Sequence, residues 1–318
     1  MLEINSSGII PYRGYQSLVT MDRLLHVYLQ PCIIILGVFG NCCSITVMRQ
    51  TRYRKSSDCF YMTLLAVFDN FILVGVYLLN YLKFVNPKWP AVILYCRMLL
   101  LFVYSTFGWS NCTLLAMTFD RFVAICFPMR ARLVCTKRRA KVYVVIMFST
   151  LLAYALPNLF WGSSIRRRYD AYPVCFFIPP SVIIQRVYDT VYLVAMTVLP
   201  LIVLAVLNAC IVVTIRTSSS TRRRLTIETT DHTPPTVPQA QITFMLLLVT
   251  HTFIILHIPY LVIFLLIMAR KRPSTLLSSL FSISKLILSL NPMINFYVYC
   301  LGGRKFRKDF SKLFCCQK

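Results

Sequence analysis

Charged residues are scarce in this chain. They make up 14% of its 318 residues, whereas hydrophobic residues make up 58% and the mean hydropathy is +0.67. A soluble domain of this length needs far more charge to stay dispersed, so the composition excludes an ordinary soluble protein. Short stretches of alternating polar and apolar residues, which would indicate a membrane β-barrel, are missing as well.

Two other patterns are absent. The chain shows no internal repeat of the kind that marks many transporters. Its 13 cysteines include no spacing typical of a zinc site. These absences disfavour a transporter and a zinc-binding protein.

Long apolar stretches, in contrast, are abundant. A bilayer core takes roughly 20 apolar residues per helix. Backbone polar groups in lipid must be paired within their own segment, so uninterrupted stretches of this length indicate helices. The stretches cover residues 27–48, 59–82, 92–127, 142–161, 187–215, 241–268 and 275–301. We therefore expect an all-α membrane protein, a bundle of seven transmembrane helices.

Basic residues between the stretches predict the orientation. Lys and Arg are more frequent after the first, third, fifth and seventh stretches than in the other connections. The positive-inside rule then places the N-terminus outside the cell and the C-terminus in the cytoplasm. Residues 1–26 are polar and mixed, with no visible cleavable signal peptide. We divide the chain into an extracellular segment (1–26), a seven-helix domain (27–301) and a cytoplasmic tail (302–318).

The tail is expected to begin with a short amphipathic eighth helix at residues 304–314. Its aromatic and leucine positions recur on one helix face, and basic residues occupy the other. The apolar positions are Phe306, Phe310, Leu313 and Phe314. Such a helix lies on the membrane surface, so membrane lipid is an expected partner.

Three covalent modifications are predicted from residue placement. Cys96 and Cys175 lie at the outer membrane edge or in an outer loop, where an oxidising exterior would pair them. Cys315 and Cys316 directly follow the amphipathic helix and are candidates for palmitoylation. Asn5 begins a glycosylation sequon in the extracellular segment.

Ionisable residues inside membrane spans are costly and indicate functional sites. Asp69 lies in the middle of the second stretch and needs a partner, a proton or a cation. Ser110 in the third stretch, with Asn291 and Asn295 on one face of the seventh, would complete an oxygen-rich pocket for a sodium ion. A protonated Asp69 hydrogen-bonded to an asparagine is the alternative.

Seven short motifs occur in an order and at spacings typical of one membrane-protein family. They are Gly40-Asn41, Leu65-Ala66 with Asp69, Cys96 followed by Asp120-Arg121, Pro128, Pro200, Pro259-Tyr260 and the asparagines of the last stretch. Over about residues 25–316 the chain therefore resembles the rhodopsin family of G-protein-coupled receptors.

The last stretch can be aligned with this family in two ways. One places Asn291-Pro292 on the family's Asn-Pro pair, and the other places Asn295-Phe296 there. The second alignment also puts Tyr299 seven residues before Phe306, as the family spacing requires, so we adopt it. In animal opsins, which belong to this family, a lysine of the last helix attaches retinal. The second alignment places Lys285 one turn outward from that position, where it would line the ligand pocket.

The resemblance implies a two-state switch between a ligand outside and a heterotrimeric G protein inside. The expected ligand-binding residues are Lys285, Tyr260, His257, Tyr104 and Phe107. The expected residues for G-protein coupling are Asp120, Arg121 and Tyr299. Nucleotide exchange takes place on the G protein, so the chain itself is not expected to be an enzyme, to carry catalytic residues, to need a cofactor beyond sodium, or to bind nucleic acid.

Further expectations concern regulation. Arrestin and a receptor kinase would act on the Ser/Thr-rich segment 216–240.

Gln239 stands where many relatives carry an acid that holds the arginine of the third helix. Arg121 is then left with Asp120 as its evident partner, and measurable basal activity is expected at the plasma membrane.

The end of the last stretch is similar to that of invertebrate FMRFamide-type neuropeptide receptors, through Asn295-Phe296, Tyr299-Cys300-Leu301, Gly303 and Phe306-Arg307. This resemblance implies an extracellular peptide ligand. Lys285 and the Arg166-Arg167-Arg168 cluster support an alternative, a receptor for an anionic small molecule such as a nucleotide or acidic lipid. The family's helix-six Trp and helix-five Tyr are His257 and Asn208 here, which motivates a third reading, a non-signalling seven-helix receptor.

Overall fold

The computed structural model describes residues 21, 24–50, 57–81, 92–166, 173–177, 179–225, 237–269 and 274–314. Within these ranges the chain forms helices and one two-stranded antiparallel sheet. The elements are η1 (Leu24–Leu29), α2 (Gln30–Met48), α3 (Ser57–Tyr81), α4 (Val92–Cys126), α5 (Pro128–Val134), α6 (Lys137–Ala155), α7 (Pro157–Trp161), β1 (Gly162–Arg166), β2 (Pro173–Phe177), α8 (Val182–Leu193), η2 (Val194–Val198), α9 (Leu199–Leu225), α10 (Val237–Ala269), α11 (Thr275–Gly302) and α12 (Arg304–Phe314).

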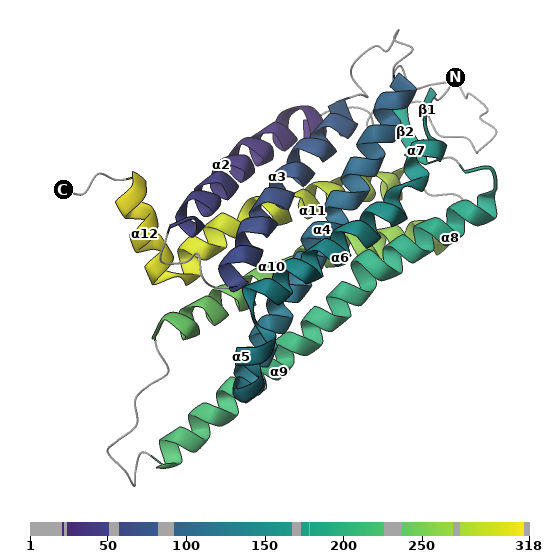
Figure 1. Cartoon of the computed structure of the whole chain (residues 1–318). Helices are drawn as coiled ribbons and strands as arrows, with labels where there is room; N and C mark the ends of the chain where they lie inside the picture. The colour runs from purple at the N-terminus through teal and green to yellow at the C-terminus, as the bar shows by residue number, and fades with distance from the viewer. Residues whose placement is uncertain are drawn as a thin grey trace.

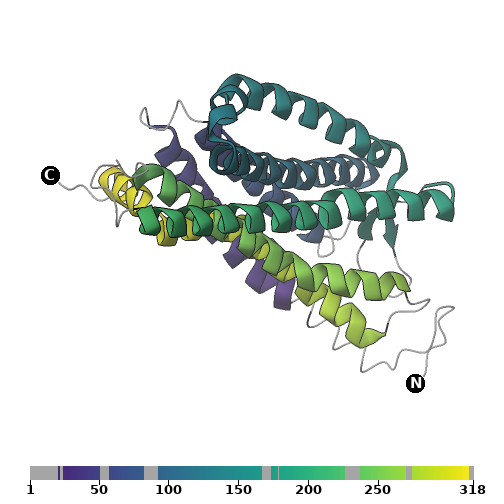
Figure 2. The same cartoon turned by 90° about the horizontal axis from the view of Figure 1, so that it is seen from below.

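Seven helical segments in the described part of the chain are long and apolar enough to cross a membrane, which confirms the predicted fold class. Three of them are composite: η1 continues into α2, α6 into α7, and α8 through η2 into α9. Figures 1 and 2 show these segments side by side along one axis, with α12 at one end of the bundle and the β1–β2 sheet at the other. The two candidate sites, one near the β1–β2 sheet and one near α12, therefore lie at opposite ends of the bundle.

Large apolar side chains cover much of the outer surface of the bundle. Ile35 and Phe39 on α2, Ile146 on α6 and Leu199 on α9 are among the exposed ones. In water such a surface would be an aggregation liability, whereas in lipid it is the surface that the hydrocarbon chains require. The surface therefore fits a multi-pass membrane protein.

The core of the bundle lies closer to the α12 end. Met117, Leu204, Phe253 and Tyr299 are buried there and join α4, α9, α10 and α11. Close approach between α2 and α11 depends on Gly40, because a Cβ at this position would lie 2.9 Å from the Cβ of Phe296. Small residues of this kind let membrane helices pack backbone to backbone.

A π-helical turn, η2, interrupts the long segment formed by α8 and α9. Pro200 has no backbone N–H, so the carbonyl of Met196 loses its ordinary helical donor. Asn111 of α4 replaces that donor, with its Nδ2 2.6 Å from the Met196 oxygen. The side-chain contact ties α4 to the segment at the point where its helix is irregular.

The eighth helix has the bounds that the sequence predicts, Arg304–Phe314. Its apolar face packs on the end of α11, with the Phe310 ring 5.3 Å and the Phe306 ring 6.0 Å from the ring of Phe296. Phe296 therefore contacts α2 on one side and α12 on the other, which fixes where α12 leaves the bundle.

Candidate functional site

A cluster of tyrosines joins three helices near the β1–β2 end. The ring centroids of Tyr104 (α4) and Tyr192 (α8) lie 4.6 Å apart, and Tyr154 (α6) stacks on Tyr188 (α8) at 4.9 Å. The Tyr154 hydroxyl donates to the Tyr188 carbonyl at 2.8 Å, and Asn158 Nδ2 donates to the Tyr188 hydroxyl at 2.8 Å. Only Tyr104 of this cluster was predicted from the sequence.

Aromatic contacts also bring the predicted residues of α10 and α11 together. The Tyr260 ring lies 5.7 Å from that of Phe281, and Lys285 Nζ lies 4.9 Å from the centroid of the same Phe281 ring. An ammonium at this distance from a ring face gains a cation–π interaction. Phe281, which the sequence analysis missed, thus connects Tyr260 with Lys285.

His257 lies on α10 one turn before Tyr260, toward the centre of the bundle, and is 4% exposed. Its Nδ1 is 2.8 Å from the Phe253 carbonyl, and its ring centroid is 3.8 Å from that of Phe253. A carbonyl only accepts hydrogen bonds, so Nδ1 carries the hydrogen. Phe107 is half-buried on α4, one turn from Tyr104. The ligand-binding roles of these residues remain predictions.

A polar hub lies in the middle of the bundle around Asp69, which is 1% exposed. Ser110 Oγ donates to Asp69 Oδ1 at 2.8 Å, and Asn295 Nδ2 donates to Asp69 Oδ2 at 2.6 Å. The hub thus links α3, α4 and α11. In the described part of the chain no hydrogen bond joins Asn291 to Asp69, so only three of the four predicted residues meet directly.

The hub supports the second alignment of the last helix. That alignment makes Asn295 the asparagine that faces Asp69, and it places Tyr299 against the eighth helix. Tyr299 is buried, and its ring centroid is 5.7 Å from that of Phe306. Asn41 of α2 adds another polar contact to α11 by donating through its Nδ2 to the Pro292 carbonyl at 3.0 Å.

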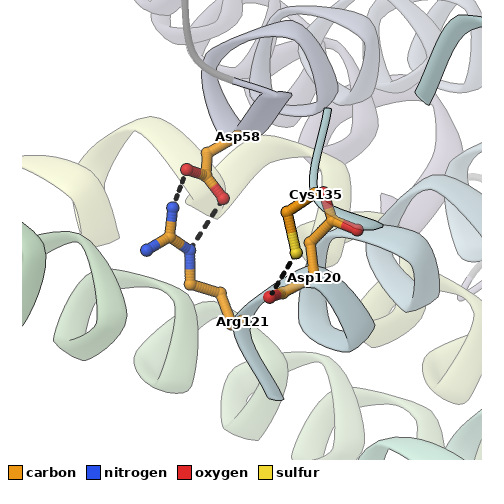
Figure 3. Close-up of polar contacts among 4 residues, drawn as sticks. All are labelled: Asp58, Asp120, Arg121 and Cys135. Atoms are coloured by element: carbon orange, nitrogen blue, oxygen red, sulfur yellow. Dashed lines mark hydrogen bonds and ion pairs between the residues drawn. The ribbon is translucent and has the colours of Figure 1, made fainter. Parts of the chain in front are cut away.

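Arg121 at the α12 end pairs with Asp58 of α3. Its Nε donates to Asp58 Oδ1 at 2.7 Å, and a second contact joins its Nη2 to Asp58 Oδ2. Asp58 and Arg121 are 7% and 9% exposed. Figure 3 shows the Arg121 side chain directed toward Asp58, while Asp120 lies beside Cys135.

The expectation that Asp120 is the partner of Arg121 is therefore wrong. Consecutive helix residues point about 100° apart, so neighbouring side chains do not face each other. The Asp120 side chain accepts a hydrogen bond from Ser57 instead. Its backbone carbonyl accepts one from the Cys135 thiol at 3.4 Å. Burial, with a smaller contribution from the Asp120 charge, raises the pKa of Cys135 to about 11, so this thiol stays protonated at neutral pH.

Asn208 connects α9 with α10 in the part of the core that lies toward α12. Its Nδ2 donates to Thr250 Oγ1 at 2.7 Å, which joins α9 to α10 within the buried core. The family's tyrosine is absent at this position, yet the amide still forms a polar contact between these helices. Asn208 thus retains an interhelical role.

Four predicted positions remain untested. Asn5, Cys315 and Cys316 lie outside the described residues, as does the side chain of Cys175. Cys96 is disulfide-bonded. Its helix α4 packs against β2, the strand that contains the Cys175 backbone. The pairing of these two cysteines stays a prediction.

The chain matches the family model described as "7 transmembrane receptor (rhodopsin family)" over residues 40–299. It is 24% identical to the thyrotropin-releasing hormone receptor of Homo sapiens, over 99% of this chain and 83% of that receptor. It is 25% identical to the FMRFamide receptor of Drosophila melanogaster, over 88% of this chain and 52% of that receptor. Identity to the motilin receptor of Homo sapiens is 35%, over 41% of this chain and 31% of that receptor. The chain belongs to the rhodopsin family and is a G-protein-coupled receptor, a member of a family of receptors rather than of enzymes.

Proposed function

We propose that this chain is a plasma-membrane receptor that binds an extracellular peptide and activates a heterotrimeric G protein. Its relatives, which are named as receptors for thyrotropin-releasing hormone, FMRFamide and motilin, support the peptide ligand. The distribution of Lys and Arg supports an extracellular N-terminus. The ligand would then bind at the β1–β2 end, and the G protein would bind at the α12 end.

The observation that carries this proposal is one helix, α10, that reaches both ends. Tyr260 and Phe281 connect α10 with Lys285 on the ligand side. Thr250 connects the same helix with Asn208 near the α12 end. Pro259 lies between these contacts, and a proline inside a helix removes a backbone hydrogen bond and permits bending.

A ligand acts on this arrangement only through a difference in affinity for the two states. A peptide that contacts Tyr260 and Lys285 more favourably after α10 has bent would shift the population toward that state. The movement would separate α10 from α9 at the α12 end and make room for a Gα subunit, which could contact Arg121 once the pair with Asp58 opens. The coupling is reciprocal, so a bound G protein should tighten peptide binding.

The test is G-protein activation in cells that display the full chain, challenged with amidated peptides, nucleotides and acidic lipids in parallel. We expect concentration-dependent activation by peptides alone. Lys285→Ala should lower peptide potency, because it removes the cation beside Phe281, while surface display stays unchanged. Activation by nucleotides or acidic lipids that is lost in Lys285→Ala would instead establish a receptor for an anionic small molecule. Peptide binding without any activation would indicate a non-signalling receptor.

We also propose that the Asp69 hub holds a sodium ion. The residues fit this ion, because the Asp69 carboxylate and the Ser110 hydroxyl are hard oxygen donors next to the Asn295 amide. The Asn295 Oδ1 atom is buried and has no hydrogen-bond partner in the described part of the chain. A buried, unpaired oxygen beside a carboxylate is a suitable additional ligand for a hard cation.

Replacing sodium with N-methylglucamine is expected to change agonist affinity several-fold in the wild-type receptor and to have no effect in Asp69→Asn. The substitution removes the charge that attracts the cation but keeps the size of the side chain. Competition binding at constant ionic strength measures the difference. An equal response of both proteins to sodium would place the cation elsewhere or exclude it.

The remaining partners follow from the segments expected outside the seven spans. Ser and Thr residues in segment 216–240 would accept phosphate from a receptor kinase and then recruit arrestin. The helix α12 would lie on the cytoplasmic lipid surface, with Cys315 and Cys316 palmitoylated beside it. Asn5 would carry a glycan outside the cell.

A further inference from the structure

We propose that Asp189, together with the surrounding tyrosines, forms a subsite for a cationic group of the ligand, an ammonium or a guanidinium. The inference rests on the proposed peptide receptor and adds the chemistry of one ligand group. Lys285 is the only charged residue among the ligand-binding residues expected from the sequence. Its ammonium favours ligand groups that carry a negative charge or a carbonyl oxygen. Asp189 gives the same end of the bundle the opposite charge.

The position of Asp189 on α8 directs its side chain toward the bundle. Successive helix residues rotate by about 100°, so Asp189 lies on the arc between Tyr192 and Leu193. Leu193 is buried and Tyr192 contacts Tyr104, so this arc faces inward. Thr190 and Val191 lie on the opposite arc and are exposed. Asp189 itself is only partly exposed.

Tyrosines on four helices belong to the surroundings of this carboxylate. Tyr188 and Tyr192 flank it on α8 and contact Tyr154 of α6 and Tyr104 of α4. The Asp189 charge acts on the phenol groups of Tyr104, Tyr154 and Tyr188, and also on Tyr260 of α10. The carboxylate therefore lies within electrostatic range of α4, α6 and α10 at once.

A carboxylate in this setting needs a positive partner. In the described part of the chain Asp189 forms no hydrogen bond and no ion pair. The Lys285 ammonium instead lies over the ring of Phe281 on its own helix, α11. A partly buried carboxylate without a counter-charge is unfavourable, which leaves free energy to be gained when a ligand cation binds. Tyrosine faces beside it add cation–π attraction, the combination by which proteins recognise ammonium and guanidinium groups.

Two N-acetylated, amidated tetrapeptide libraries provide the probes. They are identical except that one position holds arginine in the first library and citrulline, its neutral isostere, in the second. Acetylation removes the N-terminal charge, so the side chain is the only difference in cationic character. Thermal stabilisation of the purified full chain in nanodiscs measures binding, and G-protein activation in cells measures signalling.

We expect the arginine library to bind the wild-type receptor about tenfold more tightly than the citrulline library, as a charge-assisted hydrogen bond to a carboxylate predicts. Asp189→Asn should remove this preference, and Asp189→Glu should keep most of it. The exposed neighbour provides a matched control, because Thr190→Val should leave the preference unchanged. Tyr104→Leu, which removes a ring, should weaken the preference more than Tyr104→Phe.

Equal binding of the two libraries to the wild-type receptor would overturn the subsite, as would a preference that survives in Asp189→Asn. Failure of the proposed function has a different signature. An Asp189-dependent preference for arginine without G-protein activation would keep the subsite and reject the signalling receptor. Activation by peptides without any arginine preference would keep the receptor and reject the subsite.

Discussion

Replacing Asp58 with asparagine is expected to raise ligand-free signalling about tenfold. The Arg121 guanidinium is held by Asp58 through its Nε and Nη2 atoms, and both side chains are buried. Under the proposed function, a G protein contacts Arg121 only after this pair opens. If the pair favours the inactive state by about 1.4 kcal/mol, its loss changes the ratio of the two states tenfold.

The measurement is second-messenger output without ligand, normalised to the receptor displayed at the cell surface. Asp58→Glu serves as the control, because it keeps the negative charge and should stay near the wild-type level. Removing one member of a buried ion pair also destabilises the folded protein, so lower surface display is expected for Asp58→Asn. Unchanged output per displayed receptor would show that Asp58 does not restrain Arg121.

This pair reverses the expectation for the wild-type chain. Gln239 in place of an acid suggested that Arg121 lacked a restraint on the cytoplasmic side, and that basal activity would follow. The first turn of α3 provides the acid instead. We therefore expect low basal output from the wild-type receptor and substantial output only after Asp58 is changed.

Asp69→Ala is expected to destabilise the receptor by about 3 kcal/mol. The substitution leaves the Ser110 hydroxyl and the Asn295 amide without their acceptor, and each buried donor left unpaired costs about 1–3 kcal/mol. The midpoint of thermal inactivation in detergent should fall, together with the amount of receptor at the cell surface.

Asp69→Asn is the matched control for this effect. An asparagine can accept from Ser110 through its oxygen. It can donate to the Asn295 Oδ1 atom after the Asn295 amide flips, because that oxygen is unpaired in the described part of the chain. All three polar groups then stay hydrogen-bonded. We expect thermal stability close to that of the wild type. Equal destabilisation by alanine and asparagine would mean that the negative charge, rather than the hydrogen bonds, stabilises the hub.

The sequence predicted the helices because the bilayer leaves few alternatives. Each span had to be helical and apolar, so the hydropathy of the chain was sufficient to place all seven. The eighth helix was predicted from its amphipathic pattern instead. Asp69, Ser110 and Asn295 were also predicted to meet, because an ionisable side chain inside a span needs polar partners, and hydrogen bonds join them. Asn291 was included on helical periodicity, which places a residue on a face but does not set its distance to a partner.

The missed residues share one property, which is that their role depends on side chains of other helices. Asp58 appeared to be an ordinary polar residue at the start of a span. Asp189 was not among the expected ligand-binding residues, although it precedes Tyr192 by three residues, a spacing that indicates one helix face. Tyr154 carried no signal beyond its aromatic character, because only its stacking on Tyr188 reveals its place.

Composition and the periodicity of apolar residues alone determined that this polypeptide has seven membrane-spanning helices followed by an amphipathic helix. Which charges face each other was decided only by how the helices pack, since rotation and crossing of neighbouring helices bring distant residues such as Asp58 and Arg121 together. The physical reason is that burial in lipid acts on each segment separately, whereas ion pairs and ring contacts depend on two segments at once.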